Sequence, residues 1–289
     1  MTAPQRILTI AKVVGVCIES YPQIDFVMKH LSSFILTLLM IGLVGCNPLQ
    51  SADDLSTATA RASRNEQIAT QMAAGGRATL EAEEAEATAT AQSLADLLTA
   101  AKTWSILISE NFDDNANAWP TGEDDSDLSF VRFQLDAQYR WEVTAKSGFI
   151  YWARPDSPAV SDFLLFVDGR QLSGAADGQY GLVIRQVDEY NYYIFRISSD
   201  GYFAFDRSTP EGWETIIDWT GSEAIHPNQV NHLGVIAQQA RFLFFVNEQF
   251  IGEAYDDHLT EGQCGVVIGL FDAEDEAVFE FDNFELRTP

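Results

Sequence analysis

The feature that most constrains the fold is a long succession of short apolar segments that begins at Trp104. Typical segments are YRWEVTA, DFLLFVDGR, NYYIFRIS, RFLFFVNEQ and AVFEFDNFEL. They are rich in β-branched and aromatic residues and are separated by turn residues such as Asp200-Gly201, which is typical of β-strands joined by short turns. The pattern predicts about twelve to fourteen strands, and hence an all-β, antiparallel two-sheet sandwich over residues 104–289. We expect its core to come wholly from these residues.

The charge balance narrows the class of partner. The chain has 43 Asp and Glu residues against 17 Lys and Arg, which gives a formal net charge of −26. Nucleic acids and anionic membrane surfaces both require a basic footprint. We therefore expect no nucleic-acid partner, and acidity of this kind suits solubility outside the cell, cation binding, or both.

The segment MKHLSSFILTLLMIGLVGC, which begins at Met28, has the features of a signal peptide. Lys29 and His30 precede an apolar stretch of about fourteen residues, which is too short to span a bilayer comfortably. The stretch ends in LVGC, which resembles the lipobox of bacterial lipoproteins. The resemblance implies a signal peptide over residues 28–45, a diacylglycerol on Cys46, and a chain anchored to the extracytoplasmic face of the cell membrane. An uncleaved anchor is the alternative.

Two further segments flank the signal peptide. Residues 1–27 do not fit the prefix of a signal peptide, so we expect translation to begin at Met28, with an extra N-terminal helix as the alternative. Residues 46–103 consist of Cys46 and a low-complexity stretch of Ala, Thr, Glu and Ser. Ala and Glu favour helix, but the few large apolar residues cannot build a core. A partly helical tether is predicted, and a coiled-coil oligomerisation stalk is the alternative.

Several stretches of the β-rich part carry a family resemblance. They are the opening ENFDDNANAW, residues 198–225 (SSDGYFAFDRSTPEGWETIIDWTGSEAI), the pair HLGVIAQQARFLFFVNEQFIGE, and the closing VFEFDNFELR. Together they resemble the concanavalin A-like (laminin G/glucanase-type) jelly-roll domains of bacterial surface lipoproteins. They are also distantly similar to 3-keto-disaccharide hydrolase-like sandwiches. The resemblance implies a jelly-roll sandwich over most of residues 104–289. It does not imply one function, because lectins, glucanases and structural modules share this fold.

The sequence does not favour catalysis. Glucanases of this fold carry Glu-x-Asp-x-x-Glu on one strand, because alternation places the carboxylates on one face. The nearest string here, Asp272–Glu276, departs from that pattern and lies at an expected turn. We therefore expect a non-enzymatic binding or interaction module, with a glycan or a surface protein as candidate partner. A purely structural surface domain and a carbohydrate-active hydrolase are the alternatives.

Calcium is the one cofactor for which the sequence contains candidate ligands. The loop after the first strand has Asp and Asn at the spacing of a calcium loop, but Ala118 stands where an EF-hand needs glycine, which excludes that motif. The family resemblance implies a Ca²⁺ site where the opening and closing strands meet. Asp113, Asp114 and Asp282 are the candidate ligands. The alternative is turn chemistry, which Asp and Asn favour in any case.

The chain has three cysteines, at positions 17, 46 and 264. If Cys46 carries lipid and Cys17 is lost with the leader, Cys264 has no partner for a disulfide. A lone cysteine within GQCGVVIGLF is expected to be a small, buried core residue rather than a reactive thiol.

The candidate ligand-binding residues are aromatic and basic. Trp141 and Trp152 lie in strongly apolar strands and are expected to be core. Trp213 and Trp219 lie beside polar or glycine residues, so we expect them to be exposed platforms on which a sugar ring could stack.

A hairpin over YGLVIRQV and NYYIFRIS supplies the basic residues. If Val187 pairs with Tyr192, then Arg185 faces Ile194 and Val183 faces Arg196. Arg185, Tyr192 and Arg196 then share the outer face, and arginine offers fixed donors for hydroxyls and carboxylates. The opposite face collects an apolar core set: Leu182, Ile184, Tyr193, Phe195 and Ile197. The alternative role of the arginines is to pair with neighbouring carboxylates and keep the outer face soluble.

Overall fold

A computed structural model describes residues 52–289 of the chain. The predicted signal peptide, Cys46 and residues 1–27 lie outside the described residues. The chain divides into two compact units, Met1–Thr79 and Leu80–Pro289. Helix α2 (Ala52–Ala101) belongs to the second unit from Leu80 onward. Within residues 52–289, no helix has both the length and the hydropathy that crossing a bilayer requires.

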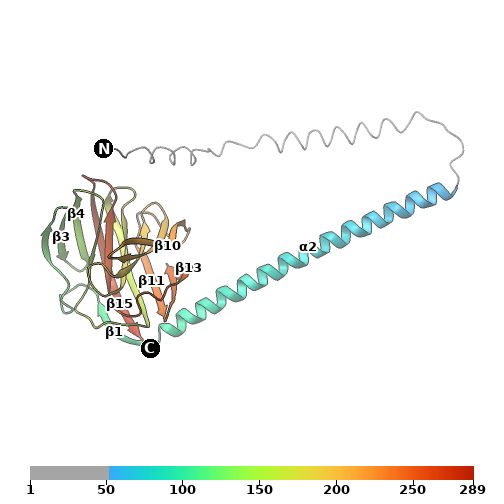
Figure 1. Ribbon diagram of the computed structural model, residues 1–289. Helices are drawn as coiled ribbons and strands as arrows, with labels where there is room; N and C mark the ends of the chain where they lie inside the picture. Colours follow the sequence, from blue (N-terminus) through green and yellow to red (C-terminus); the bar gives the residue numbers. More distant parts are fainter. Residues whose placement is uncertain (1–51) are drawn as a thin grey trace. The chain divides into compact units, whose positions relative to one another are not determined.

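The second unit is a sandwich of two antiparallel sheets, which confirms the predicted fold class (Figure 1). The nine-stranded sheet has the order β13 (Gln249–Tyr255), β12 (Arg241–Val246), β11 (Asn231–Gln238), β6 (Phe163–Gly174), β15 (Glu276–Thr288), β4 (Tyr139–Ala145), β3 (Ser129–Leu135) and β2 (Gly122–Asp125), with β1 (Ser105–Glu110) paired to β15. The six-stranded sheet has the order β10 (Gly212–Gly221), β9 (Tyr202–Thr209), β8 (Tyr192–Ser198), β7 (Gln179–Gln186), β14 (Gln263–Leu270) and β5 (Phe149–Ala153).

The main core lies between the two sheets. Every second residue of β4, including Trp141, is buried there, as the alternation of a strand requires. The inner face of the β7–β8 hairpin includes Tyr180 and the whole predicted set: Leu182, Ile184, Tyr193, Phe195 and Ile197. Cys264 is also buried in this core, and burial raises the pKa of its thiol to about 12. The predicted core position of Cys264 is therefore confirmed, and its lack of reactivity stays a prediction.

A second apolar cluster joins the end of α2 to the outer face of the nine-stranded sheet. Leu94, Leu98 and Ala101 are buried there. Their partners come from β6, β11 and β12: Leu164, Phe166, Ile236, Leu243 and Phe245. The last two turns of the predicted tether thus contribute to the packing of the domain, which corrects the expectation that residues 104–289 supply the whole core. Spaced leucines in an Ala-rich helix were too weak a signal, because only the facing sheet gives them a partner.

Beyond the helix, charged side chains cover the outer face of the nine-stranded sheet. Arg132 and Arg140 both pair with Glu142, at 3.1 and 3.4 Å. Arg140 and Arg170 both pair with Glu280, at 3.0 and 2.5 Å. We call these five residues the ion-pair ladder. Their alternation along β3, β4, β6 and β15 keeps this side of the sandwich polar.

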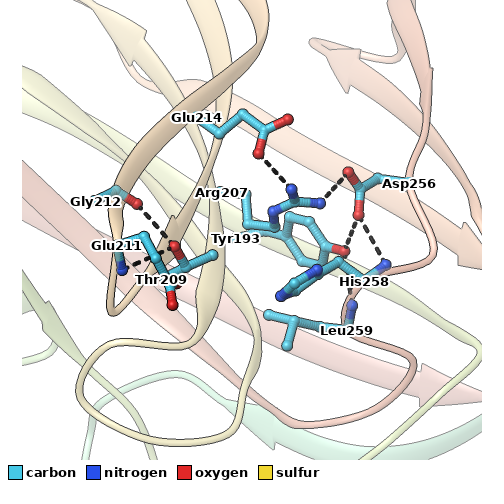
Figure 2. A network of polar contacts seen from close by, with 9 residues as sticks. All are labelled: Tyr193, Arg207, Thr209, Glu211, Gly212, Glu214, Asp256, His258 and Leu259. Atoms are coloured by element: carbon cyan, nitrogen blue, oxygen red, sulfur yellow. Dashed lines mark hydrogen bonds and ion pairs between the residues drawn. The ribbon is translucent and has the colours of Figure 1, made fainter.

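A polar network fastens the loop after β13 to the other sheet. Figure 2 shows the guanidinium of Arg207, on β9, between the carboxylates of Glu214 and Asp256. The hydroxyl of Tyr193 donates to Asp256 at 2.5 Å and accepts from the amide of Leu259 at 2.9 Å. The network ties β8, β9 and β10 to residues that follow β13, and thus holds the two sheets together at this edge.

Candidate binding face on the six-stranded sheet

The outer face of the six-stranded sheet has an apolar floor. Alternation along β8 turns Tyr192, Ile194 and Arg196 away from the main core. Val183 of β7 and Val267 of β14 pack with Ile194, and all three are fully buried although they lie on the outer side of the sheet. Larger side chains must therefore cover this floor, and they are aromatic or basic.

Three rings cover one part of the floor. Tyr192 lies between Trp152, at a centroid distance of 6.1 Å, and Trp213, at 5.8 Å, and both contacts are edge-on. Tyr192 is buried, Trp152 is half-buried, and 51% of Trp213 is exposed. We call these three residues the aromatic row. Trp213 therefore keeps exposed ring surface, which is what a stacking ligand needs.

Arg196 lies in the same face. It forms an ion pair with Asp206 and donates to the side-chain oxygen of Gln179, and its guanidinium carbon lies 5.2 Å from the ring centroid of Trp219. Thr215 donates to the other oxygen of Asp206 at 2.8 Å. Burial lowers the pKa of Arg196, and the charge of Asp206 opposes that effect. The guanidinium is therefore held in place by side chains of three strands, with its Nε left without a partner.

The structure brings together four of the five predicted ligand-binding residues: Tyr192, Arg196, Trp213 and Trp219. The fifth, Arg185, was predicted wrongly. The hairpin pairs Val183 with Ile194 and Gly181 with Arg196, so the predicted register was off by two residues. A shift of two preserves the faces, and the core set therefore remained correct. Arg185 leaves the outer face for a reason that does not depend on this register.

Arg185 lies at an irregularity of β7 and points into the molecule. Its φ is +48°, and the pairing of the neighbouring β14 shifts between Gln263 and Gly265. A Cβ on Gly262 would lie 2.3 Å from the carbonyl carbon of Arg185, so only glycine fits beside this bend. The guanidinium donates to three backbone carbonyls, those of Leu259 (2.9 Å), Ser161 (2.8 Å) and Gln239 (2.6 Å). Arg185 is therefore a buried structural residue, and its burial lowers its pKa.

Sequence reasoning missed Trp152. It was expected to be core, but it belongs to the aromatic row. In β5, Phe149 and Ala153 face the main core, so alternation turns Trp152 outward with Ile150. The signal was ambiguous because apolar residues occupy both faces of this strand, and periodicity alone cannot tell one apolar face from the other.

The predicted calcium ligands satisfy local turn chemistry. Asp113 accepts from the side chain of Asn111 at 2.6 Å, and Asp114 accepts from the amide of Ala116 at 2.9 Å. Burial raises the pKa of Asp282, and the charge of Asp113 adds to that effect. Within residues 52–289, no three acidic, histidine or cysteine side chains are arranged to hold a metal. No converging ligand set therefore supports the calcium prediction in the part of the chain that the structure describes.

The acidic string Asp272–Glu276 lies where it was predicted. It occupies the exposed turn between β14 and β15, and only Glu276 belongs to a strand. Its carboxylates consequently do not share one face of a strand, which is the arrangement that the glucanase pattern needs.

Comparison with known proteins finds structural similarity but no family. No protein-family model and no curated protein matches the sequence. Among solved structures, the chain is similar to the carbohydrate-binding module CBM66 from Bacillus subtilis, with 19% identity, a TM-score of 0.47, and coverage of 60% of this chain and 98% of that one. A protein of unknown function with a galectin-like fold from Bacillus subtilis matches with 12% identity, a TM-score of 0.47, and coverage of 63% and 96%. A Bacillus licheniformis β-glucanase matches with 12% identity, a TM-score of 0.46, and coverage of 65% and 99%.

Proposed function

We propose that this chain is a membrane-anchored, extracytoplasmic lipoprotein whose β-sandwich binds carbohydrate without cleaving it. The observation that carries the proposal is the aromatic row of Trp152, Tyr192 and Trp213 beside Arg196. Trp213 is half exposed and packs edge-on against Tyr192, so it offers a ring to the apolar C–H side of a sugar. The buried guanidinium of Arg196 fixes the polar floor beside the row. A few polar groups set among aromatic rings are typical of ligand sites.

The absence of hydrolysis is part of the proposal. Glycosidases work with two carboxyl groups, one on each side of the scissile bond. Asp206, the carboxylate beside Arg196, is engaged by that arginine and by Thr215. A carboxylate paired in this way is poorly suited to act as a proton donor or a nucleophile.

Binding and hydrolysis can be tested together. The full chain, purified in detergent, is screened on a glycan array and the best oligosaccharide is measured by calorimetry. We expect Trp213→Ala to weaken binding at least ~10-fold. Tyr255→Ala, which removes another exposed ring (65%) on the nine-stranded sheet, is the matched control and should bind like wild type. Unchanged affinity in Trp213→Ala, or release of shorter sugars from the oligosaccharide, would refute the proposal.

The anchor is tested separately. The proposal rests here on the sequence LVGC, because Cys46 lies outside the described residues. Metabolic labelling with a tagged fatty acid should mark the wild-type chain and leave Cys46→Ser unlabelled. Equal labelling of both chains would contradict the lipoprotein assignment.

A further inference from the structure

A pocket of about 260 Å³ opens at one end of the six-stranded sheet. The strand ends and turns that meet there supply its lining: Asp177, Ser198, Asp200, Tyr202, Trp219 and Phe271. The pocket is separate from the aromatic row, since none of Trp152, Tyr192 and Trp213 lines it.

Three aromatic rings form the apolar walls of the pocket. Trp219 and Phe271 have centroids 6.5 Å apart and an interplanar angle of 64°, so they form a corner rather than a stack. The exposed fractions of Tyr202 and Phe271 are 44% and 47%. Burial of these rings against a ligand would be favourable, and exposed apolar surface around one hollow is typical of ligand-binding grooves.

Two carboxylates line the same pocket. Asp200 accepts a hydrogen bond from the hydroxyl of Ser198. Within residues 52–289, neither Asp177 nor Asp200 forms an ion pair with a lysine or arginine. The cation beside the pocket is Arg196, whose guanidinium lies over the ring of Trp219. It is already paired with Asp206. The negative charge of the pocket is thus not balanced by the protein.

The combination of rings and carboxylates selects among ligand classes. Ca²⁺ needs six to eight oxygen ligands, and no three acidic groups converge in this part of the chain. A neutral ligand would contact the rings but would gain no charge–charge attraction from the two carboxylates. An organic cation satisfies both features, because aromatic faces attract ammonium groups and the carboxylates balance the charge.

We propose that this pocket binds an organic ammonium group, held among the rings of Tyr202, Trp219 and Phe271 and neutralised by Asp177 and Asp200. Two sources share this chemistry: the quaternary ammonium of a choline-like molecule and the protonated amine of an amino sugar. The acidity of the whole chain raises the local concentration of either cation. The inference does not depend on glycan binding by the aromatic row.

The test compares matched probes on the full chain in a choline-free detergent. Choline is titrated beside 3,3-dimethylbutan-1-ol, its neutral isostere, and a glucosamine tetramer beside the N-acetylglucosamine tetramer. Calorimetry and tryptophan fluorescence report binding. We expect at least one cationic probe to bind at least ~10-fold more tightly than its neutral partner, and that probe identifies the source of the ammonium group. Equal binding of both members of each pair, or no binding by any probe, would overturn the proposal.

Variants place the cation in this pocket. Asp200→Asn and Tyr202→Ala should each weaken binding of the cationic probe at least ~3-fold, while the exposed controls Glu274→Gln and Tyr255→Ala should not change it. Trp219→Ala is avoided because the ring also supports Arg196. Unchanged affinity in both pocket variants would contradict the assignment. A failure here leaves the Trp213→Ala result on glycan binding untouched, so the two proposals fail separately.

Discussion

The apolar residues on the two outer faces of the sandwich are covered in different ways. On the nine-stranded sheet, aliphatic residues such as Leu164 and Leu243 are covered by the end of α2, and the remaining surface carries the ion-pair ladder. On the six-stranded sheet, Val183 and Val267 are covered by the sheet's own aromatic and basic side chains. A helix covers part of the first face, whereas no helix packs on the described side chains that cover the second, and Trp213 keeps half of its surface exposed there. Under the proposed function, the face without the helix is the one that a ligand would use.

The largest expected effect concerns the buried ion pair at the centre of the six-stranded face. Arg196→Met leaves the carboxylate of Asp206 buried without its partner, which should lower the free energy of unfolding by about 3–5 kcal/mol. The double variant Arg196→Met/Asp206→Leu should recover most of that loss, because two apolar side chains replace the pair. Urea unfolding followed by tryptophan fluorescence measures both. A double variant as unstable as the single one would mean that the pair itself stabilises the fold.

The next effect concerns the helix that covers the nine-stranded face. Leu98 is 5% exposed, so Leu98→Asp introduces a charge into the apolar contact and should lower the free energy of unfolding by about 3 kcal/mol. Leu80 lies on the same helix with 60% exposed, and Leu80→Asp should have little effect. If both variants unfold at the same urea concentration, the helix does not cover this face in solution and the contrast between the faces disappears.

A smaller effect is expected for the aromatic row. Half of Trp213 is exposed, and Trp213→Ala should change the free energy of unfolding by less than ~1 kcal/mol. A ring kept for a ligand and not for stability should behave in this way. Thermal unfolding provides the measurement, and a loss of several kcal/mol would show that Trp213 is part of the fold's own packing.

The smallest effect is a pH dependence at the edge network of Figure 2. Burial favours a higher pKa for Asp256, but hydrogen bonds from Tyr193, the amide of His258 and Arg207 outweigh it and lower the pKa below its usual value. The stabilisation is therefore present above the pKa of the unfolded carboxyl, near 3.9, and is lost as the pH falls through the lower folded value. Asp256→Asn should reduce the slope with which the free energy of unfolding falls at acidic pH. Asp272→Asn, in the exposed turn, is the control, and equal slopes in wild type and Asp256→Asn would contradict the network's role.

Sequence reasoning was most successful where the local alternation of side chains along a strand determines which face each one occupies. The inner set of the β7–β8 hairpin was predicted residue by residue, because period-two alternation survives an error of two in register. Tyr192 and Arg196 were placed on one outer face for the same reason, whereas Trp213 and Trp219 were predicted only as exposed rings, from their polar and glycine neighbours. Their role in binding stays a prediction. Cys264 and the turn Asp272–Glu276 were also placed correctly, since each depends only on its own neighbours.

Sequence reasoning failed where the position of a side chain depends on a contact with a residue far along the chain. Arg185 turns inward because the backbone bends beside Gly262, and no rule of alternation on β7 contains that information. Leu98 is core only because β6, β11 and β12 meet the helix. The pocket at Asp200 forms from turns and strand ends that lie as much as 94 positions apart, from Asp177 to Phe271 (271 − 177).

The sequence by itself determined the class of fold, the strands and most of their buried faces, because burial of apolar residues with a period of two permits few other arrangements. It also determined the expectation of a lipid anchor at Cys46. Only the tertiary structure decided which outer face is covered and which is open, where Arg185 points, and which rings and carboxylates share a pocket. The physical reason is that these features depend on contacts between distant segments, and a local pattern carries the preference of each segment but not the identity of its partner.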